Sequence, residues 1–374
     1  MTTLDAIGPR ARSQLTVNLQ TLNGRSVFVT GAYGLLGSWL VKALIARGAR
    51  VTVLKRDAVS ASALVLEWTE QLVNVVHGDV CDAPLLERAL GEYEVDTVFH
   101  LAAQAIVGVA NRGPVSTFET NIRGTWTMLE ACRRAGVTRT IVASSDKAYG
   151  AHDELPYRET FALQPRHPYD VSKAAADFIA RSYWHTFGLP VAVTRFANLY
   201  GGGDFNFSRL VPEAVVAAIE GRAPVVRSDG TPQRDFLYVE DAVAAYLAIC
   251  DLLDDGRAGG EAYNAGPGKP RSVLEVVELI CELAGTGVMP DVRGSGTPSA
   301  EISRQWVDAG KLQTSSGWQP EVDLDDGLRR TIAWYREYLR KAPPGPGAPA
   351  PPATGHAPAH RPRRARSLPP SATR

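Results

Sequence analysis

Short apolar runs alternate with helix-like stretches over residues 25–200, and this alternation predicts strands and helices in turn. The runs are rich in β-branched residues and too short for helices, as expected for buried parallel strands. They cover residues 26–30, 50–54, 72–76, 97–101, 140–143 and 191–195. The first stretch between them repeats apolar residues at helical spacing, with Leu36, Leu40, Ala43 and Leu44 before Gly48. The pattern predicts an α/β fold with a doubly wound parallel sheet.

The pattern loosens after residue 200. We interpret residues 201–340 as a smaller C-terminal α/β lobe, mainly for substrate binding, that ends in a helix over 324–339. Residues 1–24 form an N-terminal extension. The tail, 341–374, is rich in Pro, Ala, Gly and Arg and has too few large apolar residues to offset its ordering entropy. We expect this tail to be disordered and solvated, although its arginines could also contact an acidic partner.

Composition narrows the class of protein further. The 374 residues carry a formal net charge of zero at pH 7, which does not favour nucleic acid as a partner. The four cysteines are far apart and show no metal-ligand spacing, so we expect no metal and a reduced, cytoplasmic setting. We see neither a signal peptide nor an uncharged apolar run of the ~20 residues that span a bilayer.

Glycines recur where the first predicted strand joins the first predicted helix. Gly31, Gly34 and Gly37 lie in the segment GAYGLLG, residues 31–37. Glycine allows a tight turn and lets the backbone approach a pyrophosphate held at the helix N-terminus. An ordinary tight turn is the alternative, but the strand–loop–helix setting favours a dinucleotide. We expect Tyr33, Leu35 and Leu36 to contact the same ligand.

Later segments match that ligand too. Asp79, followed by Val80, lies beyond the third predicted strand, where a carboxylate would bond the adenine amino group. Leu101, Ala102 and Ala103 close the next strand and leave room for a cofactor.

The end of the second predicted strand leaves NAD and NADP both open. An acid there binds the ribose 2′-hydroxyl of NAD, whereas Arg or Lys favours the 2′-phosphate of NADP. The chain has Lys55, Arg56 and Asp57 in succession. Asp57 has the spacing of the acid, about 20 residues past the loop, but Lys55 directly follows the strand.

Ionisable residues suited to proton transfer follow the fifth predicted strand and begin a helix. Tyr169 and Lys173 are four apart, on one helix face, where the ammonium would lower the pKa of the phenol. Ser145, Asp146 and Lys147 stand where carboxyl strand ends form a ligand crevice. A surface Tyr–Lys pair and a charged strand–loop junction are the structural alternatives. Together the two segments predict an acid–base site.

These motifs resemble the extended branch of the short-chain dehydrogenase/reductase superfamily, the NAD-dependent epimerases and dehydratases with a Rossmann sheet. Four stretches are most similar to nucleotide-sugar 4,6-dehydratases, especially those acting on CDP-glucose. They are GLLGSWL (34–40), HLAAQAIV (100–107), SSDKAYG (144–150) and GGGDFNFSRLVP (201–212). Ser145 stands where dehydratases more often have Thr, Lys55 replaces the usual acid, and RDFLYVED (234–241) is closer to epimerase-like and TDP-sugar relatives.

The resemblance implies a mechanism and a substrate. Tyr169, with Lys173 and Ser145, would oxidise C4 of a nucleoside-diphosphate hexose through a recycled NAD or NADP. Asp146 and Lys147 would then eliminate water across C5 and C6 before the hydride returns to C6. The implied substrate-binding residues are Gln104, Asn198, Arg209, Arg234 and Glu301, with Gln305 and Asn264 as looser matches. A homodimer is expected.

Other functions stay open at this stage. A sugar 4-epimerase needs Ser145, Tyr169 and Lys173 but no pair for elimination, so Asp146 and Lys147 favour a dehydratase. A 5,6-dehydratase would use similar groups. A non-catalytic NAD(P)-sensing regulator would be expected to have lost part of the catalytic set, which is complete here.

Overall fold

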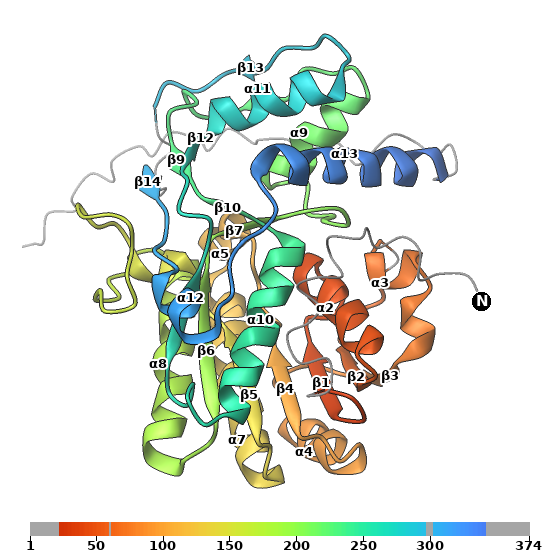
Figure 1. The fold of residues 1–374 in the computed structure, drawn as a ribbon, viewed down its shortest axis with the longest axis vertical. Coiled ribbons are helices and arrows are strands. Elements are labelled where there is room, and N and C mark those ends of the chain that lie inside the picture. The colour runs from red at the N-terminus through yellow and green to blue at the C-terminus, as the bar shows by residue number, and fades with distance from the viewer. Residues whose placement is uncertain (1–21, 60, 297–301, 342–374) are drawn as a thin grey trace, which may run out of the picture. The chain divides into compact units, whose positions relative to one another are not determined.

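The main sheet has seven strands in the order β11-β6-β5-β4-β1-β2-β3, and each neighbouring pair is parallel (Figure 1). The computed structural model describes residues 22–59, 61–296 and 302–341. The predicted tail and most of the predicted N-terminal extension lie outside these ranges. The strands of this sheet are β1 (Ser26–Thr30), β2 (Arg50–Lys55), β3 (Asn74–His77), β4 (Thr97–His100), β5 (Arg139–Ala143), β6 (Val191–Phe196) and β11 (Ala262–Ala265). The predicted doubly wound fold is confirmed, and its strand order reverses between β1 and β4, where such sheets bind ligands.

Helices cover both faces of this sheet. One face carries α2 (Leu35–Ala46), α10 (Val239–Asp254) and α12 (Gly310–Ser316). The other carries α4 (Ala83–Glu92), α7 (Gly124–Ala135) and α8 (Pro168–Phe187). Apolar strand residues such as Val27 and Phe28 point to opposite faces and are fully buried, which is why these strands read as continuous apolar runs.

A second group of helices, α9 (Leu210–Ile219), α11 (Val273–Ala284) and α13 (Leu324–Lys341), packs around its own apolar core (Figure 1). Short ladders accompany it. They are β7 (Asn198–Tyr200) with β10 (Phe236–Tyr238), β9 (Gln233–Arg234) between β12 (Arg271–Ser272) and β14 (Arg304–Gln305), and β8 (Val225–Val226) with β13 (Asp291–Val292). The remaining short helical elements are α3 (Ala63–Leu66), η1 (Thr69–Leu72), α5 (Val107–Arg112), α6 (Pro114–Phe118), η2 (Glu119–Arg123) and η3 (Asp146–Tyr149).

The observed structure differs from the prediction in the start of the third strand and in the origin of the seventh strand of the sheet. The third strand begins at Asn74 rather than at residue 72, because Leu72 belongs to η1. The chain beyond residue 200 also returns to the main sheet, where β11 pairs with β6. The predicted boundary at residue 201 therefore does not separate all strands of the main sheet from the second lobe. That residues 201–340 mainly bind substrate stays a proposal. None of the helices in the described ranges has the length and apolar character of a bilayer span.

Arg139 connects the main sheet to α10. Its side chain is 1% exposed, and its guanidinium lies 2.7 Å from an Asp96 carboxylate oxygen and 2.5 Å from an Asp254 oxygen. A buried guanidinium is costly unless it is paired, so the two carboxylates allow β5 to begin inside the core.

Replacing Arg139 with Met should lower the free energy of unfolding by about 2 kcal/mol, because Asp96 and Asp254, each 28% exposed, lose their hydrogen-bonded counter-charge. Urea unfolding would measure the loss. Arg133, whose ion pair with Glu130 is solvent-exposed, is the control, since Arg133→Met should cost less than about 1 kcal/mol. Equal losses in the two variants would contradict this account.

Candidate functional site

The glycine loop after β1 is so tight that neither Gly31 nor Gly37 could carry a side chain without a collision. Gly31 has φ +71°, and a Cβ there would lie 2.7 Å from the Leu101 carbonyl carbon. A Cβ on Gly37 would lie 2.2 Å from the Gly31 carbonyl oxygen. The loop therefore presents bare backbone at the N-terminus of α2, which is the arrangement that receives a pyrophosphate. The residues present fit a dinucleotide cofactor.

The end of β4 is fastened to this loop. The Thr30 hydroxyl accepts hydrogen bonds from the backbone N–H groups of Leu101 and Ala102, each at 3.1 Å. Leu101, Ala102 and Ala103 are half-buried, as is Gln104, whose backbone N–H donates to Asn121 at 2.7 Å. The predicted cofactor residues of β1 and β4 thus meet at the switch point of the sheet.

The reacting groups after β5 form one compact turn. The Ser145 hydroxyl donates to an Asp146 carboxylate oxygen at 3.1 Å and accepts the Lys147 backbone N–H at 3.2 Å. The Lys147 ammonium lies 3.5 Å from the side-chain oxygen of Gln305 on β14. Asp146 and Gln305 are each buried and each keep one side-chain atom, Oδ2 and Nε2, without a hydrogen-bond partner in the described structure. Both atoms are themselves buried, so each keeps an unused hydrogen-bonding capacity inside the site.

Tyr169 and Lys173 reach the same place from α8. The Lys173 ammonium donates to the Ala143 carbonyl at the end of β5, at 2.8 Å. Helix α8 packs against η3, which places Tyr169 beside the turn, and the Ser145 hydroxyl is among the groups that lower the pKa of Tyr169. The structure therefore brings together all five residues predicted to be catalytic.

The pKa of Tyr169 differs from the expected one. Its side chain is only 8% exposed, and burial raises its pKa to about 12, against the smaller lowering effect of Arg209. Burial also lowers the pKa of Lys173 to about 8. The expectation that Lys173 lowers the pKa of the phenol is not met in this structure, because desolvation is the largest effect on both groups.

Asp146 is the group whose protonation the fold controls most directly. It is 2% exposed, and burial raises its pKa against the opposing effects of Lys147, Ser145 and Arg234. A raised pKa favours the protonated carboxyl, which is the form that can donate a proton.

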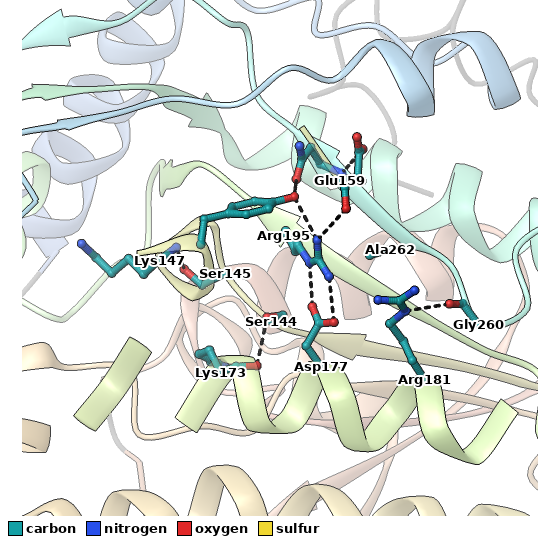
Figure 2. A network of polar contacts seen from close by, with 12 residues as sticks. Ser144, Ser145, Lys147, Glu159, Lys173, Asp177, Arg181, Arg195, Gly260 and Ala262 are labelled. Atoms are coloured by element: carbon teal, nitrogen blue, oxygen red, sulfur yellow. Dashed lines mark hydrogen bonds and ion pairs between the residues drawn. The ribbon is translucent and has the colours of Figure 1, made fainter. Parts of the chain in front are cut away.

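A buried polar network around Arg195 holds the turn after β5 in place (Figure 2). The Arg195 guanidinium on β6 makes two bonds to the Asp177 carboxylate of α8, at 2.7 and 2.9 Å. It also donates to the Tyr149 hydroxyl at 3.1 Å, and this hydroxyl donates to Asn264 on β11 at 2.8 Å. Since Tyr149 ends η3, the turn that carries Asp146 is fixed to β6, α8 and β11.

The remaining predicted substrate-binding residues are Asn198, Arg209, Arg234 and Glu301. Arg209 and Arg234 each act electrostatically on a reacting group, Arg209 on Tyr169 and Arg234 on Asp146. Arg209 is held 3.0 Å from the carboxylate of Asp204, and Asn198 donates to the Asp235 carbonyl at 3.3 Å. Glu301 lies outside the described residues.

The predicted adenosine-side residues are engaged with protein groups. Lys55 forms an ion pair with Glu70 of η1 at 2.5 Å, whereas Arg56 pairs with Asp57 at the surface. Asp79 accepts the Cys81 backbone N–H at 2.8 Å, and Val80 is buried against α7.

Sequence reasoning did not identify Glu70, Tyr149, Arg195 or Asp204. Tyr149 and Asp204 lie within the stretches SSDKAYG and GGGDFNFSRLVP but received no role there, whereas Glu70 and Arg195 lie in no motif and act through partners elsewhere in the chain. A hollow of about 920 Å³ beside α8 is lined by other residues, including Glu159, Arg181, Arg195 and Lys311, and by none of the predicted site residues. Within the described ranges no cluster of His, Cys, Asp and Glu could hold a metal ion.

Substituting Gly37 with Ala should remove most of the bound cofactor from purified protein and lower its melting temperature, because the new methyl group collides with the Gly31 carbonyl. Mass spectrometry of released nucleotide would measure cofactor content. Gly91 on α4 is the control, since a Cβ there meets nothing within 4 Å and Gly91→Ala should be neutral or slightly stabilising. Full cofactor content in the Gly37 variant would refute the role of the loop.

Comparison with known proteins agrees with this geometry. The model of the NAD dependent epimerase/dehydratase family matches residues 27–266. The chain is 32% identical over 340 residues to dTDP-glucose 4,6-dehydratase 1 of Escherichia coli K12, which covers 83% of this chain and 92% of that protein. It is 33% identical over 330 residues to the dTDP-glucose 4,6-dehydratase of Xanthomonas campestris pv. campestris, covering 82% and 92%.

Solved structures show the same likeness. A dTDP-glucose 4,6-dehydratase from Streptomyces venezuelae with NAD bound has a TM-score of 0.75 and 32% identity, covering 83% of this chain and 97% of that one. A UDP-glucose 4-epimerase from Thermotoga maritima with UDP-glucose has a TM-score of 0.77 and 28% identity, covering 84% and 99%. The glycine cradle, the Ser145–Tyr169–Lys173 arrangement and these relatives together show that the chain belongs to the NAD-dependent epimerase/dehydratase family.

Proposed function

We propose that this protein is a nucleotide-sugar 4,6-dehydratase that converts a nucleoside-diphosphate hexose into its 4-keto-6-deoxy form. The observation that carries the proposal is Asp146, a buried carboxyl with a raised pKa and one unpartnered oxygen, directly beside Lys147. Oxidation and reduction at C4 alone do not require such a pair. Relatives of dehydratase activity at 31–33% identity over most of the chain support the same conclusion.

NAD, which solved relatives bind, supplies the hydride acceptor for C4, the hydride donor for C6, and a positive charge that favours phenolate. Tyr169 takes the proton of the sugar 4-hydroxyl, with Ser145 orienting that hydroxyl through its own. The Lys173 ammonium donates to the Ala143 carbonyl. When Lys173 is protonated, its positive charge lies on the same side of the site as Tyr169. The NADP alternative has no support from these relatives.

Elimination is the task of the turn after β5. The 4-ketone acidifies the hydrogen at C5, and Lys147, once unprotonated, takes that proton. Asp146 gives its proton to the departing 6-hydroxyl, so that water leaves and a C5–C6 double bond forms. Gln305 accepts from the Lys147 ammonium on one side and has an amide N–H to donate on the other. Asp146 ends as a carboxylate and Lys147 as an ammonium, so the proton count balances.

The pyrophosphate of the substrate requires positive charge near these groups. Arg209 and Arg234 come from α9 and β9 and are the arginines that act on Tyr169 and Asp146. Their planar guanidinium groups suit bidentate contact with oxyanions. We assign them to the substrate diphosphate, with Gln104 and Asn198 on the sugar.

Incubation of the purified protein with a panel of nucleoside-diphosphate hexoses tests the reaction itself. One substrate should lose one water, with solvent deuterium entering at C5, and the cofactor should end oxidised. A product of unchanged mass with inverted C4 would instead make the protein a 4-epimerase. A product that loses water and keeps an exocyclic C5–C6 double bond would make it a 5,6-dehydratase.

The variant Lys147→Ala should separate oxidation from elimination. Because Lys147 acts only after the 4-ketone forms, reduced cofactor should accumulate, seen by its near-ultraviolet absorbance, while water release falls at least about 100-fold. Tyr169→Phe is the matched comparison, since it should prevent reduction of the cofactor altogether while substrate binding survives. Water release by Lys147→Ala at the parent rate would remove the elimination role and favour the epimerase.

We further propose a homodimer through the outer faces of α7 and α8. Trp126 on α7 and Phe178 and Phe187 on α8 are 45%, 56% and 55% exposed, which favours an apolar interface. Trp126→Glu combined with Phe187→Glu should shift the light-scattering mass from two chains to one. Met289→Glu changes an even more exposed apolar residue elsewhere, at 69% exposure, and should leave the mass unchanged. A single-chain mass for the parent protein would refute the proposal.

A further inference from the structure

Three segments of the chain converge at the carboxyl end of β2. Lys55 is the last residue of β2, Tyr33 belongs to the glycine loop, and Glu70 lies in η1 just before β3. One carboxylate oxygen of Glu70, Oε1, accepts hydrogen bonds from both the Tyr33 hydroxyl and the Lys55 ammonium, each at 2.5 Å. The ammonium also lies 4.9 Å from the centre of the Tyr33 ring.

The position of this cluster gives it a role. In a Rossmann unit, the residue at the end of the second strand and the glycine loop flank the adenosine ribose of a dinucleotide. A carboxylate in this place accepts the 2′-hydroxyl of NAD, and a basic side chain accommodates the 2′-phosphate of NADP. This chain has a lysine at the strand end, which by itself favours NADP.

The contacts of Glu70 reverse that preference. Its carboxylate balances the Lys55 charge, and both side chains are largely covered, at 26% and 16% exposure. Within the described part of the chain, the second oxygen of Glu70, Oε2, makes no hydrogen bond. Hydrogen bonds from Lys55 and Tyr33 lower the pKa of Glu70, so it is a carboxylate at neutral pH.

We propose that Glu70 is the cofactor-selecting carboxylate of this protein, taking the place of the acid that β2 lacks. Its open oxygen accepts the 2′-hydroxyl of NAD, its charge repels a 2′-phosphate, and its bond to Lys55 keeps that ammonium from a phosphate. Asp57 does not have this role, because it is 60% exposed and pairs with Arg56 at the surface. The inference depends on the family's dinucleotide cofactor and not on the proposed dehydration.

The test measures which nucleotide the protein holds. Full-length protein is equilibrated with an equimolar mixture of NAD and NADP until exchange is complete, and the bound nucleotides are quantified by mass spectrometry. The parent should hold mainly NAD. Glu70→Gln keeps acceptor and donor atoms in place but removes the charge, and it should raise the bound NADP-to-NAD ratio about tenfold or more.

Lys55 variants separate this proposal from direct phosphate binding by lysine. Lys55→Ala in the parent should leave the ratio within about twofold, because Glu70 already occupies the ammonium. In the Glu70→Gln background, Lys55→Ala should cancel most of the gain in NADP. The control is Glu67→Gln, which removes a nearby carboxylate that pairs with Lys42 at 2.6 Å and should not change the ratio.

Two results would overturn the proposal. One is an unchanged ratio in Glu70→Gln. The other is a tenfold loss of NADP in Lys55→Ala alone, which would show that Lys55 binds the 2′-phosphate in the parent and which stays informative even if the Glu70 variant folds poorly. Since the readout is bound nucleotide, a failure to dehydrate any sugar leaves this test unaffected.

Discussion

The buried ion pair between Arg195 and Asp177 fixes the reacting groups relative to one another. Both side chains are almost completely buried, so either charge alone would be strongly destabilising and the two must stay together. Asp177 belongs to α8, the helix that carries Tyr169 and Lys173, and Arg195 belongs to β6. Through the Tyr149 hydroxyl the same guanidinium also holds the turn with Asp146. One interaction thus positions together the residues to which we assign oxidation and elimination.

Burial then decides how these groups hold their protons. It raises the pKa of Tyr169 to about 12, lowers that of Lys173 to about 8, and raises that of Asp146. All three shifts favour the neutral form, as expected where water is excluded. A neutral carboxyl suits protonation of a leaving hydroxyl, whereas a phenolate needs added positive charge. In the proposed mechanism, burial thus favours the proton-donating form of Asp146, whereas Tyr169 depends on added positive charge to become a base.

The adenosine side follows a different physical rule. Lys55 and Glu70 are partly exposed, and hydrogen bonds from Lys55 and Tyr33 lower the pKa of Glu70 more than burial raises it. Lys55 at the end of β2 is not free to bind a 2′-phosphate, because it forms an ion pair with Glu70 of η1. In our proposal, selection of NAD depends on the Glu70 oxygen that Lys55 and Tyr33 leave open to the ribose. No local sequence motif indicates these contacts.

The sequence by itself determined the features that depend on near neighbours. Apolar runs located the strands from Ser26–Thr30 to Val191–Phe196, glycine spacing located the cofactor loop, and the four-residue spacing placed Tyr169 and Lys173 on one helix face. The tertiary structure decided the rest. It paired β11 with β6, brought Gln305 to Lys147, and joined Glu70 to Lys55. It also set the pKa of Tyr169 through burial rather than through Lys173. Strand and helix periodicity is written in consecutive residues, whereas desolvation and ion pairing depend on which distant segments pack together, and only the folded chain specifies that.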